Sequence, residues 1–121
     1  MARILVIEDD NEVRDYLESV LSREGYDVQG ASNGKDGVAI FQLNPADLVI
    51  TDIIMPEKDG IETIMDLKRK NSALKVIAIS GGGRSEPENY LHSAKLIGAN
   101  LTLKKPFTNQ EMLQAVRELL S

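Results

Sequence analysis

Three short segments of the chain are almost wholly apolar and rich in β-branched residues. They are Ile4-Leu5-Val6-Ile7, Leu48-Val49-Ile50 and Val76-Ile77-Ala78-Ile79. Strands buried on both faces of a parallel sheet have this composition, because helices cover both faces. Residues 27–31 and 100–103 alternate between apolar and polar positions more weakly. Such alternation indicates one better-solvated face, so we expect three central strands and two edge strands.

Helical periodicity fills the intervals between these strands. Apolar residues recur at spacings of three and four in three segments: Val13, Leu17, Val20 and Leu21; Ile61, Ile64 and Met65; and Leu113, Val116 and Leu120. We expect Met65 and Met112 on the buried faces of their helices. Weaker patterns predict helices over residues 37–43 and 88–96. A helical segment therefore follows each of the five strands.

This alternation of strands and helices is typical of a parallel α/β sheet. Turns are expected at three glycines, Gly25, Gly34 and Gly98. Thr108 fits the N-cap of the last helix, and Asp10 fits that of the first. A chain of 121 residues suits one compact domain. We therefore expect a single domain over residues 1–121, with no output domain in the chain and a monomer as the default state.

Composition excludes several classes of site. The chain has no cysteine and one histidine, so disulfides, thiolate metal sites and a structural zinc site are excluded. The formal net charge of −5 argues against non-specific nucleic-acid binding by this domain. No apolar run approaches the roughly 20 residues of a membrane span. The first apolar run ends early in acidic residues, unlike a signal peptide, so we expect a cytoplasmic protein with no membrane association.

Polar and charged side chains follow four of the five predicted strands. Glu8, Asp9 and Asp10 follow the first, Asp52 the third, Ser80 the fourth, and Lys104 and Lys105 the fifth. Ligands of open parallel sheets bind beyond the carboxyl ends of the strands, so we expect these side chains to converge. Crowded carboxylates favour a hard cation such as Mg²⁺. A carboxylate can also attack phosphorus, so the set fits phosphoryl transfer to an aspartate.

Four groups of residues together resemble the receiver domain of bacterial response regulators. They are Ile4-Leu5-Val6-Ile7-Glu8-Asp9-Asp10, Asp52-Ile53-Ile54-Met55-Pro56 with Asp59-Gly60, Ser80 after an apolar strand, and Lys105-Pro106-Phe107. The resemblance covers residues 3 to 120. It implies a flavodoxin-like (βα)5 three-layer sandwich whose parallel five-stranded sheet has the order 2-1-3-4-5. It also implies a role in two-component (His-Asp) phosphorelay signal transduction.

The resemblance implies the partners and the metal site as well. A sensor histidine kinase or a histidine phosphotransfer protein is expected to phosphorylate Asp52, which switches an interaction surface for a downstream protein target. Asp9 is expected to bind Mg²⁺ (or Mn²⁺) directly and Glu8 through water. Asp52 and the main-chain carbonyl of Ile54 are the other expected ligands. The domain would be a phosphoacceptor that promotes its own phosphorylation and dephosphorylation, and not an enzyme.

Further roles follow from the same resemblance. Lys105 is expected to pair with Asp52 and later with the phosphoryl group, and Ser80 to bond a phosphoryl oxygen. The bond between Lys105 and Pro106 is expected to be cis. Where many family members carry an aromatic residue, this chain has Thr102, so we expect a different switch rearrangement.

Two hypotheses concern residues beside the acceptor. The glycine-rich loop over residues 81–85 is expected to become ordered on phosphorylation. Ile54, which is bulky and apolar, is expected to hinder attacking water and slow autodephosphorylation.

The residues of the predicted site bear on three alternative functions. A flavin binder of the same topology would need a glycine- and hydroxyl-rich phosphate loop where Glu8-Asp9-Asp10 stands. A hydrolase of the haloacid-dehalogenase type would want a second aspartate at position 54, which is Ile54. A non-phosphorylated pseudo-receiver that serves only as an interaction module is the third alternative. Pseudo-receivers usually lack one or more site residues, whereas this chain has the full set.

Overall fold

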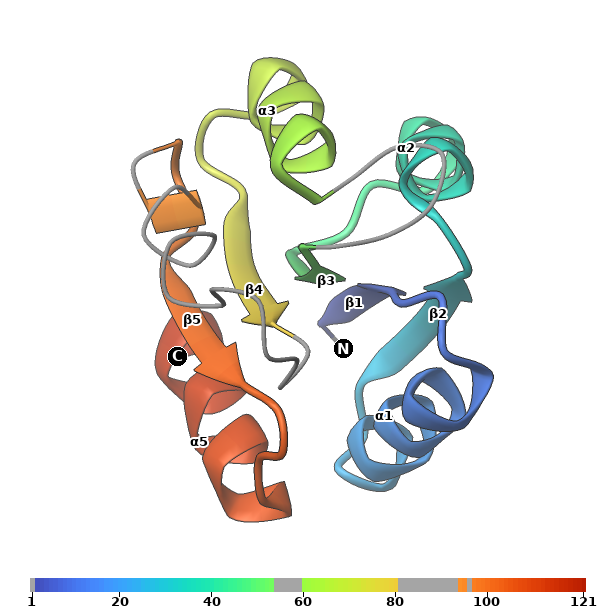
Figure 1. Ribbon diagram of the computed structural model, residues 1–121, viewed down its shortest axis with the longest axis vertical. Coiled ribbons are helices and arrows are strands. Elements are labelled where there is room, and N and C mark those ends of the chain that lie inside the picture. The colour runs from blue at the N-terminus through green and yellow to red at the C-terminus, as the bar shows by residue number, and fades with distance from the viewer. Residues whose placement is uncertain (1, 54–59, 81–93, 96) are drawn as a thin grey trace.

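Five parallel strands form the centre of the molecule (Figure 1). The computed structural model describes residues 2–53, 60–80, 94–95 and 97–121. The strands are β1 (Arg3–Ile7), β2 (Asp27–Ala31), β3 (Leu48–Asp52), β4 (Lys75–Ser80) and β5 (Leu101–Lys104). Their order in the sheet is β2-β1-β3-β4-β5, and every neighbouring pair is parallel. This confirms the predicted order, with the two weakly alternating segments at the edges.

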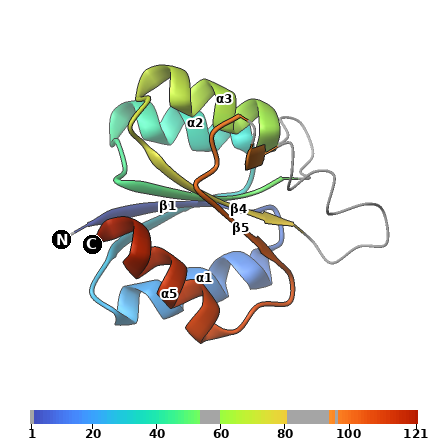
Figure 2. The same ribbon diagram turned by 90° about the vertical axis from the view of Figure 1, so that its left-hand side faces the viewer.

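Helices cover both faces of the sheet. They are α1 (Asn11–Arg23), α2 (Gly34–Leu43), α3 (Gly60–Lys70) and α5 (Asn109–Leu120). Figure 2 shows α2 and α3 on one face and α1 and α5 on the other, which gives three layers. The helix predicted over residues 88–96 lies outside the described residues, apart from positions 94 and 95. None of the described helices is both long and apolar enough to cross a membrane.

The core alternates between the two faces of the sheet. Ile4 and Val6 of β1 pack with the residues of α1 and α5, whereas Leu5 and Ile7 pack with those of α2 and α3. All four side chains are buried. Successive residues of a strand point to opposite faces, so a strand covered on both sides must be apolar throughout. Each such side chain stabilises the fold by roughly 1.5–3 kcal/mol.

Two predicted helix caps are confirmed. The Asp10 side chain accepts hydrogen bonds from the backbone N–H groups of Glu12 (2.9 Å) and Val13 (3.3 Å) at the start of α1. Thr108 accepts from the Glu111 N–H (3.0 Å), and the Glu111 side chain accepts from the Thr108 N–H (2.8 Å). This capping box satisfies two N–H groups that have no partner within α5. It fixes the point at which the chain turns from β5 into α5.

Two details differ from the sequence interpretation. Gly34 does not form a turn of its own but is the first residue of α2, behind the N-cap Asn33. Met65 is 43% exposed, although Met112 is fully buried as expected. The buried face of α3 consists of Gly60, Thr63, Ile64 and Leu67. Met65 follows Ile64 and therefore lies about 100° further round the helix, away from the sheet. Gly25 and Gly98 do lie at turns, with φ of 93° and 121°.

Candidate functional site

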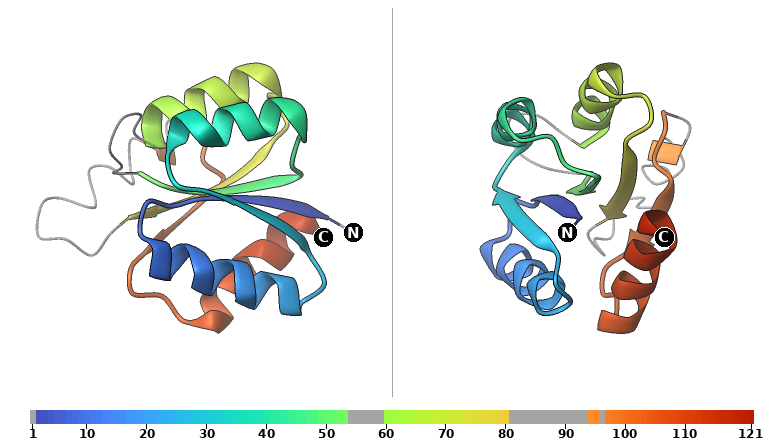
Figure 3. Two further views of the ribbon diagram at one scale, coloured as in Figure 1. Left: turned by 90° about the vertical axis from the view of Figure 1, so that its right-hand side faces the viewer. Right: turned by 180° about the vertical axis from the view of Figure 1, so that it is seen from behind.

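The candidate site lies where the central strands end. The strand register places Ile7, the last residue of β1, opposite Thr51 of β3. It places Asp52, the last residue of β3, opposite Ile79 of β4. The residues that follow β1, β3 and β4 therefore meet at one edge of the sheet. The start of β1 and the end of α5 lie at the opposite end of the sheet (Figure 3, left).

Three carboxylates meet at this edge. Glu8, Asp9 and Asp52 each offer an oxygen atom, and these atoms lie within 4.8 Å of one another. Glu8 and Asp52 are buried, whereas Asp9 is exposed. Like charges at such distances repel one another, and burial strengthens the repulsion because less water screens it. The cluster therefore requires compensating positive charge.

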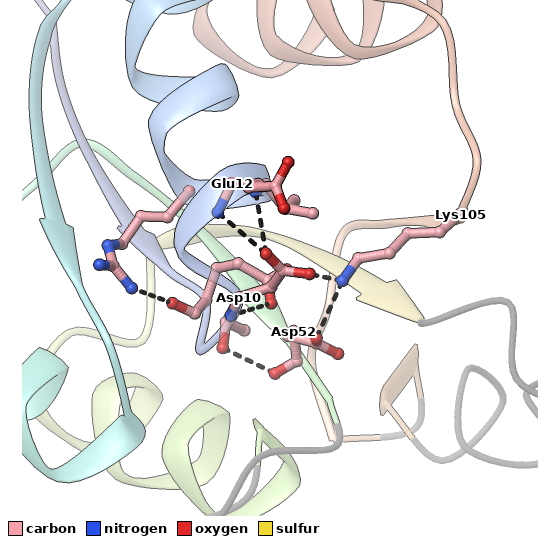
Figure 4. Close-up of polar contacts among 8 residues, drawn as sticks. Asp10, Glu12, Asp52 and Lys105 are labelled. Carbon is pink, nitrogen blue, oxygen red and sulfur yellow. Dashed lines mark hydrogen bonds and ion pairs between the residues drawn. The ribbon is translucent and has the colours of Figure 1, made fainter.

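Lys105 supplies part of that charge from the segment between β5 and α5. Its ammonium nitrogen Nζ lies 2.8 Å from Glu8 Oε1 and 3.2 Å from Asp52 Oδ2 (Figure 4). Its backbone N–H donates to the carbonyl of Ser80 (2.9 Å), which ties the segment to the end of β4. The peptide bond to Pro106 is cis, as predicted. Burial alone would lower the pKa of Lys105, but the carboxylates of Glu8 and Asp52 outweigh it and raise the pKa.

Glu8 is the most constrained of the acids. Its backbone N–H donates to Ala31 (3.0 Å), its carbonyl accepts from Arg14 Nη1 (2.8 Å), and its Oε2 accepts from the Asp10 N–H (3.1 Å). Oε1 is buried and pairs with the Lys105 ammonium, but no donor in the described part of the chain is aligned for a hydrogen bond to it. Burial raises the pKa of Glu8 to about 7; the contact with Lys105 opposes this shift, and the charge of Asp52 adds to it.

The donor set fits a hard divalent cation. All three side chains of the cluster offer carboxylate oxygens, and Mg²⁺ prefers oxygen ligands. Glu8 Oε1 is a buried oxygen whose hydrogen-bonding capacity is not used by an aligned donor, which is unusual in a folded protein. A cation at the cluster would offset both the repulsion and this deficit. The chemistry of the site thus agrees with the predicted metal ligands among the described residues.

The structure brings together most of the predicted site residues. Glu8, Asp9, Asp52 and Lys105 form one cluster. Ser80 is fully buried at the end of β4, one residue beyond the register partner of Asp52. The predicted metal ligand at position 54 and the loop over residues 81–85 lie outside the described residues.

Sequence reasoning did not single out two residues that contact the site backbone. Arg14 reaches back from α1 to the Glu8 carbonyl. The Thr51 hydroxyl donates to the main-chain carbonyl of Asp52 (2.9 Å). No local pattern marks Arg14, because its contact depends on how α1 folds back over the edge. Thr51 did carry a signal, since it is a polar residue inside an otherwise apolar run.

Comparisons with known proteins agree with this geometry. Residues 4–117 match the family model of the response regulator receiver domain. A probable transcriptional regulatory protein of Picosynechococcus is 36% identical to the chain, over 98% of the chain and 49% of the relative. The transcriptional regulatory protein CpxR of Klebsiella pneumoniae is 32% identical, over 99% of the chain and 50% of its own length. The chain thus spans about half the length of these curated relatives.

A solved structure gives the same result. The crystal structure of a response regulator receiver domain protein from Clostridium thermocellum superimposes with a TM-score of 0.89 at 30% identity. The match covers 98% of this chain and 94% of that one. The likeness therefore extends over the whole fold, including the strand ends that carry the acidic cluster.

Proposed function

Because the chain belongs to the family of response regulator receiver domains, we propose that it accepts a phosphoryl group on Asp52 from a phosphohistidine. The donor would be a sensor histidine kinase or a histidine phosphotransfer protein. One observation carries the proposal: Asp52 is a buried carboxylate with an ammonium at 3.2 Å and two further carboxylates beside it. The domain would be a phosphoacceptor and not a turnover enzyme.

The transfer exchanges one bond to phosphorus for another. A carboxylate oxygen of Asp52 attacks the phosphorus, and the bond from phosphorus to the donor's imidazole nitrogen breaks. The electron pair of that bond stays with the imidazole ring, which takes up a proton. Lys105 would stabilise the negative charge on the phosphoryl oxygens, because its ammonium lies at the carboxylate that attacks. Ser80 is the predicted partner of the same oxygens after transfer.

We propose Mg²⁺ as the cofactor, with Mn²⁺ as a possible substitute. Glu8, Asp9 and Asp52 would hold the ion, and the main-chain carbonyl of Ile54 is the further ligand that the family resemblance implies. When bound, the cation supplies positive charge to the transferring phosphoryl group. Glu8 and Asp9 would then act only as ligands, which leaves Asp52 as the nucleophile.

An apolar hollow beside Lys105 offers a contact for the donor protein. Its lining residues are Val13, Tyr16, Lys105, Pro106 and Phe107, and its volume is about 430 Å³. Lys105 both lines this hollow and touches Asp52, so a protein seated there would lie next to the acceptor. We propose protein partners for this domain and no direct nucleic-acid contact, in keeping with its net charge of −5.

The test uses two small phosphodonors, acetyl phosphate and phosphoramidate, the second of which carries a P–N bond like that of phosphohistidine. The protein is incubated with each donor with and without Mg²⁺, and its intact mass is measured. The expected result is a gain of one phosphoryl group that requires Mg²⁺ and is absent from Asp52→Asn. The pseudo-receiver alternative predicts no gain with either donor. A gain that persists in Asp52→Asn would place the acceptor elsewhere.

A further inference from the structure

Thr51 is a fully buried polar residue one position before the end of β3. It follows Ile50 and precedes Asp52 in β3, whose five residues are all buried. Alternation along the strand places it on the same face as Val49, which belongs to the apolar cluster beneath α2 and α3. A valine would be the ordinary residue here, since a buried hydroxyl costs free energy unless it is hydrogen-bonded.

The Thr51 hydroxyl forms a hydrogen bond with the backbone of Asp52, the proposed phosphoacceptor. Its Oγ1 donates to the carbonyl oxygen of Asp52 at 2.9 Å. The register between β1 and β3 ends at Thr51, whereas that between β3 and β4 continues to Asp52. The hydrogen bond from Thr51 therefore contacts Asp52, the first residue of β3 beyond its pairing with β1.

Helix α3 approaches the same stretch of backbone from another side. The N–H of Gly60, the first residue of α3, donates to the carbonyl of Ile53 (2.6 Å). A Cβ atom on Gly60 would lie 2.2 Å from the Asp52 carbonyl oxygen and 2.5 Å from Ile53 Cα, so only glycine fits. The N–H of Ile53 donates to Ile79 of β4 (3.0 Å). The peptide unit after Asp52 is thus held by hydrogen bonds to Thr51 and β4, with Gly60 of α3 packed closely against its carbonyl oxygen.

We infer that Thr51 is a positioning residue for phosphoryl acceptance: its hydroxyl fixes the peptide after Asp52 and so aims the Asp52 carboxylate. The inference rests on the proposed function. The Asp52 side chain is attached to the Asp52 Cα atom, and this atom is bonded directly to the carbonyl carbon. The oxygen of that carbonyl accepts the hydrogen bond from Thr51. A tilt of that peptide would move the carboxylate relative to Lys105 Nζ, which lies only 3.2 Å away. Misplacement of a reacting group by about 1 Å can slow a reaction by a factor of about 100.

The main test variant is Thr51→Val, which keeps the branched shape and removes the hydroxyl. The rate of phosphorylation by acetyl phosphate is measured at saturating Mg²⁺ over a range of donor concentrations. We expect the maximal rate to fall about tenfold while the half-saturating donor concentration stays the same, because positioning acts on the transfer step. Thr51→Ser keeps a hydroxyl and should restore most of the rate. A Thr51→Val rate equal to that of the wild type would overturn the inference.

A matched control separates positioning from a loss of stability. Val49→Ala weakens the same face of the same strand two residues earlier, without touching the Asp52 carbonyl. Unfolding by urea gives the stability of each variant. The inference predicts that Val49→Ala is destabilised and keeps the wild-type rate. If Val49→Ala slows transfer as much as Thr51→Val does, Thr51 acts only through stability and the inference is wrong.

Two further outcomes are distinguishable. If Thr51→Val does not fold, Thr51→Ala also lacks the hydroxyl and is measured in the same way, with the same expected fall in maximal rate. If the wild-type protein itself accepts no phosphoryl group from either small donor, the proposed function fails, and the inference fails with it. A phosphorylated wild type with an unimpaired Thr51→Val refutes the inference alone.

Discussion

The interior of the sheet and its carboxyl edge differ sharply in what they bury. In the interior, β1 and β4 contribute apolar side chains to both faces: Ile4 and Ile77 to one, and Leu5 and Ala78 to the other. At the edge, within one residue of the strand ends, the described residues include four buried polar side chains: Glu8, Thr51, Asp52 and Ser80. The same strands thus carry an apolar core over most of their length and buried polar groups where they end.

This difference separates stability from function. Apolar burial stabilises the fold by about 25 cal/mol for each Å² removed from water, whereas a buried charge costs free energy unless it is well paired. Among the described residues, the cluster sets the three carboxylates of Glu8, Asp9 and Asp52 against the ammonium of Lys105. We therefore expect interior substitutions to lower stability without changing phosphoryl transfer, and edge substitutions to change phosphoryl transfer without a comparable loss of stability.

The largest expected effect is a loss of stability on substitution of a residue in the interior of the sheet. Ile77 of β4 is fully buried, and Ile77→Ala should lower the free energy of unfolding by about 3 kcal/mol through lost burial and the resulting cavity. The folded protein should keep the wild-type rate of phosphorylation within about twofold. Urea unfolding and intact-mass kinetics measure the two quantities. A large loss of rate in the folded variant would contradict the separation.

A substitution of Lys105 tests whether the carboxyl edge of the sheet controls the rate of phosphorylation. Lys105→Met removes the ammonium that contacts Glu8 and Asp52, so phosphorylation by acetyl phosphate should slow by about 100-fold. The rate is measured at saturating Mg²⁺, so that weaker metal binding does not account for the loss. Lys104→Met is the matched control, because the neighbouring lysine forms neither of these two ion pairs. A Lys105→Met rate within threefold of the wild type would exclude the proposed role.

Asp52→Asn should show that the site lowers stability. Removing this charge relieves its repulsion with Glu8 and Asp9, while Lys105 keeps its contact with Glu8. In the absence of divalent cations at pH 7.5, we expect the free energy of unfolding to rise by about 1 kcal/mol. Added Mg²⁺ should stabilise the wild type more than the variant. A variant less stable than the wild type without metal would show that the Asp52–Lys105 pair dominates the repulsion.

The smallest expected effect is the pH dependence of the metal-free protein. Because the pKa of Glu8 is raised from 4.5 to about 7, the folded state holds this proton more tightly than the unfolded chain. The resulting stabilisation is fully present below pH 4.5 and is lost as the pH rises through about 7. Between pH 8 and pH 6.5 the wild type should gain about 0.8 kcal/mol relative to Glu8→Gln. The free energy of unfolding of both proteins is measured with urea, in EDTA, at each pH. An equal change with pH in the two proteins would contradict the expected gain.

Much of the fold could be predicted from local pattern. Continuous apolar runs identified the central strands, weak alternation identified β2 and β5, and the caps Asp10 and Thr108 were placed correctly. Met65 was placed wrongly, because three apolar residues on α3 do not by themselves fix the centre of the buried face. That centre is set by where the helix meets the sheet.

The candidate site was predicted in its residue types but not in its contacts. The acids, the lysine and their positions at strand ends followed from sequence and family resemblance. The contacts of Arg14 with the Glu8 carbonyl and of Thr51 with the Asp52 carbonyl did not. Both hydrogen bonds are made to backbone carbonyls, which every residue has. A pair of complementary side chains therefore could not predict them from the sequence.

The periodicity of the elements and the chemistry that follows each strand can be predicted from the sequence alone, because both depend on residues close together in the chain. The charge balance of the site depends instead on the tertiary structure. Asp52 and Lys105 are 53 positions apart in the sequence. The ion pair between Glu8 and Lys105 joins the segment after β1 to the segment after β5. The raised pKa of Glu8 depends on burial by the assembled sheet and on the charges that this assembly brings near it.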